Sequence, residues 1–275
     1  MTIHYAVQGV LFSIEVDWAL DDDVADTVMP TCVLPGPICR ATRFVVRRRH
    51  GSFSVSRAGR RLWSAASEAE LIPWLESEIV NWLLKKLQRF VQLHAAAIER
   101  RGRAVLIAGP PDSGKTSLAC ALGLLGWGVM SDEVALIEPR APAVLSFPRA
   151  MLVKAGTVRR LSSLRRFPRR RVLLEGGLES VRYVNITALC GNVTNRARVS
   201  TIAFPEWSRT SSVEPMGERE ALERLVQTSL NAARRPKRTV DTCIGLVRNS
   251  KLLRVRIGKL CDAARALSDA MGAER

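Results

Sequence analysis

Short stretches of alternating hydrophobic and polar residues dominate the first quarter of the chain. They predict strands at VQGVLFSIEV (7–16), CRATRFVVRR (39–48) and GSFSVSR (51–57), with a turn at VLPGP (33–37). Alternation with a period of two is typical of strands that bury one face and leave the other in water. The pattern favours a small N-terminal module that is β-rich or mixed α/β.

A helical repeat replaces this alternation between residues 67 and 90. Ser67, followed three positions later by Glu70, is a capping-box signature, although Pro73 leaves the first residue of the helix open. Apolar side chains then recur at intervals of three and four, which predicts one buried helix face: Leu71, Trp74, Leu75, Ile79, Trp82 and Leu83. We expect a long helix that connects the N-terminal module to the rest of the chain.

The next fifty residues combine apolar runs with glycines and acids. VQLHAAAIERRGRAVLIAG (91–109) predicts a hairpin whose turn lies around residues 100–103, where Gly102 tolerates positive φ. A helix is expected from Thr116 to Leu125, ended by the glycines of LGWG (125–128). VMSDEVALIEP (129–139) predicts a buried strand interrupted by two acids.

The remaining pattern completes a mixed α/β protein. Further strands are predicted at YVNITALCG (183–191), VSTIAFPEW (199–207) and LLRVRIG (252–258), and helices at 217–235 and 259–272. We expect two domains: residues 1–90 with the connecting helix, and residues 91–275 as the domain that carries the chemistry. The N-terminal domain is a candidate for substrate recognition.

Composition excludes several classes of protein. With 275 residues, 47% hydrophobic and 25% charged, the chain has enough apolar material for a folded core. No apolar run is long enough to span a bilayer, and the first residues lack the features of a signal peptide, so we expect a cytoplasmic protein without membrane association. The cysteines are scattered without metal-ligand spacing and are expected to be buried or idle thiols: Cys32, Cys39, Cys120, Cys190, Cys243 and Cys261.

The stretch GPPDSGKTSL (109–118) carries the clearest chemical signal. It matches G-x-x-x-x-G-K-[ST] between a predicted strand and a predicted helix, which is the context of a phosphate-binding loop. Lys115 would bridge the β- and γ-phosphates of ATP, and the Thr116 hydroxyl would bind Mg²⁺. The alternative is a glycine-rich turn that caps an ordinary helix. The predicted nucleotide contacts are Gly109, Pro110, Pro111, Asp112, Ser113, Gly114, Lys115, Thr116 and Ser117.

Two acids and one histidine are candidates to work beside this loop. Asp132 and Glu133 interrupt a hydrophobic strand, where one carboxylate can hold Mg²⁺ and another can take a proton from an attacking hydroxyl. If the backbone is extended, their side chains point to opposite sides. His94 would orient Asp132 if their strands are neighbours. The alternatives are a strand end with solvated acids and a core histidine.

Residues 93–139 resemble the catalytic core of HPr kinase/phosphorylase and its wider family of P-loop serine kinases. The shared features are a histidine strand, a hairpin, the glycine loop, a short helix that ends in glycine, and a strand with two acids. The resemblance implies a P-loop kinase core of mixed β-sheet flanked by helices. It also implies transfer of phosphate from ATP to a serine of a peptide or protein, with Asp132 as catalytic base and His94 as its support.

The departures from the family narrow the function. Glu133 stands where a second Asp is usual, the loop spacer PPDS is less rich in glycine, and the family's Mg²⁺-binding Glu could correspond to either Glu175 or Glu179. The chain is most similar to divergent members that phosphorylate the C-terminal serine of lasso peptide precursors. A protein kinase that acts on HPr in carbon regulation is the alternative, and a homo-oligomer stays open.

The charge adds a preference for anionic partners. The net charge is +16, with 35 arginines against 7 lysines, and RRLSSLRRFPRRR (159–171) holds seven arginines. This segment is either a recognition element for an acidic or carboxylate group or a flexible, solvated loop. Nucleic acid is disfavoured as a partner because aromatic residues are not interleaved with the arginines. The other remaining hypotheses are an ATP-binding module without an acceptor and a nucleic-acid-binding protein that uses ATP.

Overall fold

The computed structural model describes residues 2–16, 27–36, 40–191 and 193–272, which form two compact units. The first unit comprises Met1–Leu87 and Arg149–Asn185, and the second comprises Gln88–Pro148 and Ile186–Arg275. The first boundary lies close to the one expected at residue 90, but Arg149–Asn185 groups with the N-terminal residues. Cys39, Pro37 and the start of the strand expected at 39–48 lie outside the described residues.

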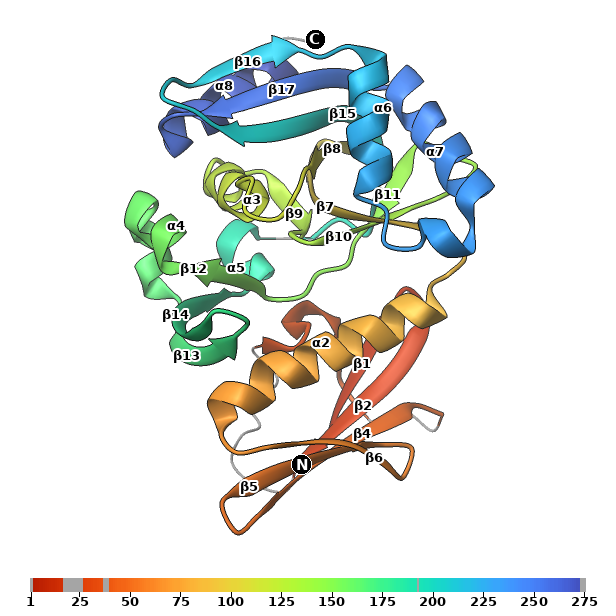
Figure 1. Cartoon of the computed structure of the whole chain (residues 1–275), viewed down its shortest axis with the longest axis vertical. Helices are drawn as coiled ribbons and strands as arrows, with labels where there is room; N and C mark the ends of the chain where they lie inside the picture. Colours follow the sequence, from red (N-terminus) through yellow and green to blue (C-terminus); the bar gives the residue numbers. More distant parts are fainter. Residues whose placement is uncertain (1, 17–26, 37–39, 192, 273–275) are drawn as a thin grey trace. The chain divides into compact units, whose positions relative to one another are not determined.

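A six-stranded sheet forms the N-terminal part of the first unit (Figure 1), in the order β3-β1-β2-β4-β5-β6. Its strands are β1 (Thr2–Val7), β2 (Val10–Val16), β3 (Val33–Leu34), β4 (Thr42–Arg49), β5 (Ser52–Arg57) and β6 (Arg60–Ala65). The single strand predicted at 7–16 is wrong at its start, because Gln8 and Gly9 both have positive φ and form the β1–β2 turn. The short 3₁₀ helix η1 (Pro30–Cys32) precedes β3.

The helix α2 (Glu68–Lys86) covers this sheet along the predicted apolar face. The Trp82 ring meets those of Phe12 and Phe44 edge to face, with centroids 5.9 and 5.5 Å apart. Ser67 is the N-cap, but its side chain makes no capping bond; instead Glu70 Oε2 accepts the Ala66 N–H at 2.8 Å. Pro73 lies inside the helix, which begins before it at Glu68.

A second, three-stranded sheet completes the first unit, in the order β12-β14-β13. Its elements are β12 (Met151–Lys154), α4 (Ala155–Arg160), the 3₁₀ helix η2 (Ser162–Arg166), β13 (Arg169–Leu174) and β14 (Gly177–Val184). The arginine-rich segment 159–171 is therefore folded, and its alternative interpretation as a flexible loop is wrong. Leu161, Leu164 and Phe167 are buried and fix the segment to the unit.

A buried ion pair explains why the segment after residue 148 belongs to the first unit. Glu76 on α2 is only 3% exposed, and its Oε1 accepts a hydrogen bond from Arg149 Nη1 at 3.0 Å. Tyr183 on β14 lies in the same region: burial raises the pKa of its hydroxyl, and the charge of Glu76 raises it further. Two oppositely charged groups so far from water must stay together, because separating them leaves a buried charge without compensation.

The second unit is built on an eight-stranded sheet, in the order β11-β10-β7-β8-β15-β17-β16, with β9 also paired to β7. The strands are β7 (Val91–Arg100), β8 (Arg103–Ala108), β9 (Gly128–Ser131), β10 (Val134–Ile137), β11 (Ala143–Leu145), β15 (Arg196–Trp207), β16 (Ser212–Pro215) and β17 (Lys251–Ile257). The helices are α3 (Lys115–Leu124), α5 (Ile186–Cys190), α6 (Glu218–Gln227), η3 (Ala232–Arg234), α7 (Pro236–Arg248) and α8 (Leu260–Gly272).

Several predicted elements differ from the observed ones. The strand predicted at 183–191 ends at Val184, and α5 follows it. The helix predicted at 217–235 ends at Gln227, and the sequence pattern missed α7 altogether. Helix α6 ends there because the chain turns to pair with β7, where the Leu230 N–H donates to Gln92 O, and Pro236 then occupies the first turn of α7.

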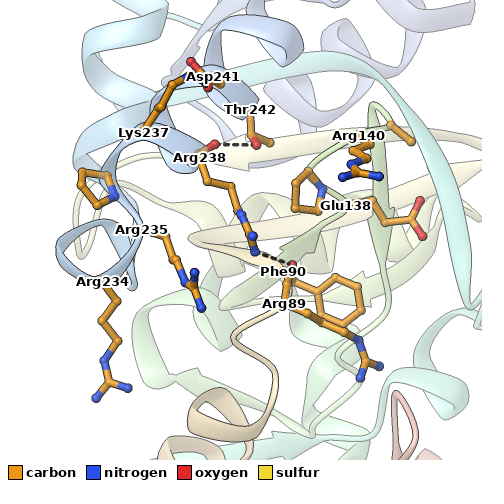
Figure 2. A pocket seen from close by; sticks show the side chains of 13 residues that line it. Arg89, Phe90, Glu138, Arg140, Arg234, Arg235, Lys237, Arg238, Asp241 and Thr242 are labelled. Atoms are coloured by element: carbon orange, nitrogen blue, oxygen red, sulfur yellow. Dashed lines mark hydrogen bonds and ion pairs between the residues drawn. The ribbon is translucent and has the colours of Figure 1, made fainter.

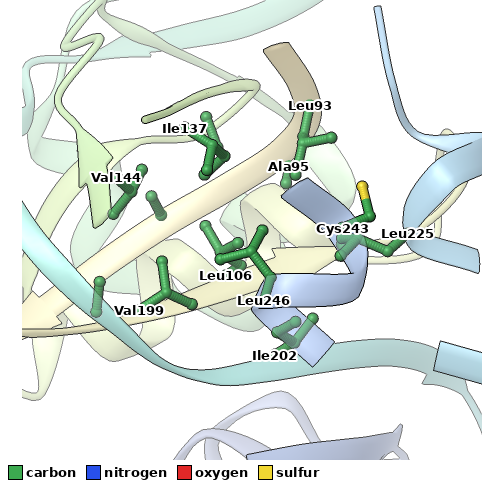
Figure 3. Packing of buried hydrophobic residues seen from close by; sticks show 14 of the residues in the cluster. Leu93, Ala95, Leu106, Ile137, Val144, Val199, Ile202, Leu225, Cys243 and Leu246 are labelled. Atoms are coloured by element: carbon green, nitrogen blue, oxygen red, sulfur yellow. The ribbon is translucent and has the colours of Figure 1, made fainter. Parts of the chain in front are cut away.

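Helices cover both faces of this sheet. Helices α6 and α7 lie side by side on one face (Figure 1), where Leu225, Cys243 and Leu246 pack on Leu93 and Leu106 (Figure 3). Helix α3 packs on β7, β8 and β9 and against α8. A mixed sheet between two helical layers is the α/β architecture that the sequence predicts.

Strand direction brings several strand ends to one edge of the sheet. β8, β15 and β17 are parallel, so their carboxyl ends meet at the same edge. β7 is antiparallel to β8, and the pairing of Ala95 with Ala108 leaves Val91–His94 beyond the end of β8. The chain after α6 takes the place of β8 there: the His94 N–H donates to Thr228 O and the Leu230 N–H to Gln92 O.

We predict that Glu76→Gln lowers the free energy of unfolding of the first unit by about 3 kcal/mol, because Arg149 keeps its charge and loses its partner. Urea unfolding followed by circular dichroism measures the change. Glu78→Gln is the matched control on the same helix, since Glu78 pairs with Arg57 at a partly exposed site; we expect less than about 1 kcal/mol for it. Equal losses for the two variants would contradict a special role of the buried pair.

Candidate functional site

The glycine loop lies between β8, which ends at Ala108, and α3, which begins at Lys115. It reverses direction through two left-handed residues, Asp112 with φ 57° and Gly114 with φ 103°. Because the first N–H groups of a helix have no carbonyl acceptor within it, α3 directs its positive end at the space inside the loop. The predicted order of strand, loop and helix is therefore present at the carboxyl edge of the parallel strands.

Close contacts hold the loop in this conformation. A Cβ atom at Gly114 would come within 3.0 Å of Ile257 Cδ1 and 3.3 Å of Trp207 Cζ2, and one at Gly109 would come within 2.9 Å of Ser113 Oγ. The indole Nε1 of Trp207 donates to Asp112 O at 2.9 Å. The ends of β15 and β17 thus pack against the loop. Gly114 is required both by its positive φ and by these contacts, and Gly109 by its close approach to Ser113.

Lys115 is folded into the loop. Its Nζ donates to Gly109 O at 2.9 Å and to Pro110 O at 2.8 Å, and the residue is only 6% exposed. Burial lowers the pKa of its ammonium group, and the nearby carboxylates of Glu133, Asp112 and Asp132 oppose that decrease. The structure therefore brings both predicted acids within electrostatic reach of the loop lysine.

The two acids occupy a turn between β9 and β10, both of which pair with β7. The Ser131 hydroxyl fixes this turn by accepting the backbone N–H of Val134 at 3.1 Å and of Glu133 at 3.4 Å. Asp132 is 2% exposed, whereas Glu133 is half-buried. The charge of Asp132 also adds to the effect of burial in raising the pKa of the Cys120 thiol on α3.

His94 lies next to this turn by strand register. It is paired across the sheet with Val134, two positions from Asp132, and is half-buried. The expectation that the histidine strand neighbours the strand with the acids therefore holds. The support of Asp132 by the imidazole stays a prediction. Glu175 and Glu179, the other acids considered, belong to the β13–β14 hairpin region of the first unit.

The polar groups of the loop and of the acid turn are of the kinds that bind a triphosphate and Mg²⁺. Ser113 Oγ is buried within the loop and has no hydrogen-bond partner among the described residues, so a polar group inside the loop would satisfy it. The described residues contain no cluster of three or more His, Cys, Asp or Glu side chains suited to a metal. Mg²⁺ does not need one, because it is commonly held by one or two protein oxygens together with substrate phosphates and water. Thr116, Asp132 and Glu133 offer such oxygens.

Sequence analysis missed the residues that fix the site in place. Trp207 forms a hydrogen bond with Asp112 O in the loop, ninety-five positions earlier in the sequence. Asn231 forms hydrogen bonds with Gln92 N and Phe90 O at the start of β7. Nothing local in the sequence marks either of them. Ser131 is different, because a serine directly before two turn residues is a recognisable turn signal.

Comparison with known proteins gives little beyond this geometry. The sequence matches no family profile and no curated protein. Among solved structures it is similar to the Hpr(Ser) kinase/phosphatase from Coxiella burnetii, with a TM-score of 0.31 and 12% identity, over 66% of this chain and 97% of that one. A likeness this weak carries no functional conclusion. Among the described residues, none of the helices combines the length and the apolarity needed to cross a membrane.

We predict that Gly114→Ala destabilises the second unit more than Gly126→Ala does. Both glycines have positive φ, at 103° and 84°, so both variants carry about 1–2 kcal/mol of backbone strain. Only the methyl group at residue 114 meets neighbours, which adds about 1 kcal/mol of overpacking. Urea unfolding of the two variants measures the difference. A Gly126→Ala loss as large as that of Gly114→Ala would show that the contacts with Ile257 and Trp207 do not constrain the loop.

Proposed function

We propose that the protein is an ATP-dependent kinase that transfers the γ-phosphate to a serine hydroxyl of a peptide or protein. The observation that supports this most directly is the convergence of Asp132 and Glu133 on Lys115 of the glycine loop. A binding module needs the loop, its lysine and at most one carboxylate that holds Mg²⁺, whereas two adjacent carboxylates at the same point allow one to hold Mg²⁺ and the other to take a proton. An enzyme that activates a hydroxyl beside the phosphates does.

Binding would use the loop as it stands. MgATP supplies the phosphoryl group to be transferred. The N–H groups at the start of α3, the Ser113 hydroxyl and the Lys115 ammonium would contact the phosphate oxygens, and the Thr116 hydroxyl would contact Mg²⁺. Lys115 would exchange its bonds to Gly109 O and Pro110 O for phosphate oxygens, which are stronger acceptors because they are charged.

Transfer would depend on Asp132. Its carboxylate takes the proton of the serine hydroxyl while the hydroxyl oxygen bonds to the γ-phosphorus, and the bond to the bridging oxygen breaks so that ADP leaves with the electron pair. Lys115 and the helix N-terminus balance the charge that develops on the leaving group. His94 would hold the carboxylate in position, and half-buried Glu133 would share Mg²⁺ with Thr116.

The acceptor is the finer part of the proposal. The C-terminal serine of a lasso-type precursor peptide is the acceptor that the resemblance of residues 93–139 implies, and HPr is the alternative. The carboxylate that follows a C-terminal serine is an anionic group, which suits a chain with a net charge of +16. The two acceptors differ in size and in the position of the serine, so they are separable by experiment.

We predict that Asp132→Asn abolishes phosphoryl transfer, by at least about a hundredfold, while leaving MgATP affinity within about threefold of the wild type. The amide is close to the carboxylate in size but cannot accept the proton. Isothermal titration with MgATP and mass spectrometry of acceptor peptides measure the two quantities. Glu133→Gln is the companion variant, for which we expect a higher Mg²⁺ requirement and retained transfer at saturating Mg²⁺.

Two outcomes would contradict the kinase proposal. Failure of the wild-type protein to bind MgATP would remove the nucleotide site itself. Binding and hydrolysis that Asp132→Asn leaves unchanged would indicate a nucleotide-binding module without an acceptor.

We predict further that a peptide ending in serine gains phosphate faster than the same peptide with one glycine added after that serine. The reason is that a terminal carboxylate beside the acceptor offers the guanidinium groups of this basic chain a charged group to bind. Mass spectrometry of the two peptides in competition measures the ratio. Equal rates would remove the C-terminal serine as the preferred acceptor and favour an internal serine, as in a folded protein substrate.

A further inference from the structure

A pocket of about 1030 Å³ opens in the second unit, away from the glycine loop. Its walls come from three segments: the residues before β7, the turn between β10 and β11, and the start of α7 (Figure 2). The lining residues are Arg89, Phe90, Glu138, Arg140, Arg235 and Arg238, with Arg234 and Lys237 also at the α7 side. Such a volume exceeds what a single phosphate or carboxylate group occupies.

The charge of this arginine pocket is not neutralised from within. Its two carboxylates are engaged, Glu138 with Arg196 at 2.7 Å and Asp241 with Lys237 at 2.7 Å. Arg140, Arg235 and Arg238 form no ion pair with any carboxylate of the described residues. Figure 2 shows Arg238 reaching across toward Phe90, where its Nη1 contacts Arg89 O at 3.5 Å. Several guanidinium groups thus face one hollow without an internal counter-charge.

The pocket is built on a fixed framework. Asn231, 5% exposed, accepts the Gln92 N–H at 3.1 Å and donates to Phe90 O at 2.9 Å, which ties the chain before α7 to the start of β7. Pro236 begins the thirteen-residue α7, so the positive end of this helix is directed at the same side. The arginines are therefore carried by backbone whose position is set by hydrogen bonds.

The chemistry of the walls selects a peptide over other anions. Nucleic acid would need exposed aromatic rings for stacking, but Phe90, the one aromatic residue of the wall, is 8% exposed, with the Arg89 guanidinium 4.7 Å from its centroid. A single phosphate group would contact only part of a pocket of about 1030 Å³ and would leave several of its guanidinium groups without a partner. Separated guanidinium forks on several sides suit several carboxylates on an extended chain.

Strand register links the arginine pocket to the proposed catalytic acid. The pocket begins at Phe90, just before β7, and β7 leads from there to His94 and Ala95, beside the acid turn and the end of β8. Four residues of strand cover about 13 Å. We infer that an acidic segment in the pocket and a hydroxyl at Asp132 would be separated by at least about four residues of extended peptide.

We propose that the arginine pocket binds an acidic segment of the acceptor peptide, a few residues from the serine that receives the phosphate. This inference rests on the proposed kinase function for its purpose, but the binding itself requires no nucleotide and no catalysis. It assigns substrate recognition to Arg235, Arg238 and Arg140 in the second unit, and not only to the N-terminal domain.

Fluorescein-labelled hexaglutamate is the first probe, with labelled hexaglutamine as its uncharged counterpart, and fluorescence anisotropy of the full-length protein without nucleotide is the measurement. We expect the wild type to bind hexaglutamate with an affinity that falls as salt increases, and the double variant Arg235→Ala/Arg238→Ala to bind at least about tenfold more weakly. Arg248→Ala, at the opposite end of α7, is the matched control and should stay within about twofold. Arg140→Ala gives a second, independent variant because this arginine lies on a different segment.

Three results would overturn the proposal. The first is hexaglutamate binding that the double variant and Arg140→Ala leave unchanged. The second is equal binding of hexaglutamine, which would remove charge as the cause. The third is an oligothymidylate of the same charge that binds tighter than hexaglutamate and loses affinity in the same variants, which would make the pocket a nucleic-acid site.

A kinase assay separates this inference from the proposed function. The acceptors are two serine peptides with a four-glycine spacer, one preceded by four glutamates and the other by four glutamines. We expect Arg235→Ala/Arg238→Ala to raise the KM of the acidic peptide at least about fivefold with little change in kcat, and to leave the glutamine peptide unaffected. If neither peptide is phosphorylated but the anisotropy results hold, the kinase proposal falls and the acidic-peptide site stands; if both are phosphorylated with unchanged KM, the reverse holds.

Discussion

The candidate site depends on the hydrogen bonding of one strand, β7. On one side β7 pairs with β8, whose end becomes the glycine loop, and on the other side it pairs with β9 and β10, which carry the acids between them. A shift of one residue in either pairing would turn Asp132 or the loop to the other face of the sheet. The alanines of L-H-A-A-A, together with Ile98, are fully buried in β7, so both helical layers can pack closely on this strand and hold its register.

Burial of charge around this strand defines the chemistry. Lys115 and Asp132 are both nearly excluded from water, and a lone charge in such a place would be costly. The charge of Lys115 is offset in part by the carboxylates of Glu133, Asp112 and Asp132, which oppose the lowering of the Lys115 pKa that burial causes. The same low-dielectric surroundings would strengthen the interaction of these groups with a phosphate chain, as the proposed function requires.

The sequence predicted the local parts of this arrangement and missed those that depend on distant residues. The hairpin, the loop and α3 are contiguous and follow from turn chemistry and apolar runs, and Arg101 and Gly102 form the predicted turn with positive φ. The single strand predicted at 129–139 is wrong, because the acids form a turn between β9 and β10. The division of the chain could not be read in the same way, because Arg149 joins Glu76 across seventy-three positions. Trp207 at the loop and Asn231 at the start of β7 are equally distant in sequence from what they hold, and α7 was hidden because its amphipathic pattern directly follows the arginines of 234–238.

The distribution of arginine partners shows why net charge alone did not locate a binding surface. In the second unit, Arg224 and Arg254 meet Glu206 and Glu220 in a network that neutralises itself beside β15, β17 and α6. The arginines of α7 and of the β10–β11 turn lie on the same unit but face a hollow whose carboxylates are already engaged. An anion gains most binding energy where positive charge is concentrated and uncompensated, and that condition is a property of the fold and not of the composition.

The arginine-rich segment 159–171, which is prominent in the sequence, is partly committed to structure. Arg169 Nε donates to Ser180 on β14, and neighbouring apolar residues are buried and hold the segment in place. Arg235 and Arg238 have no carboxylate partner among the described residues and line a pocket, so they are the stronger candidates for recognition of an acidic partner.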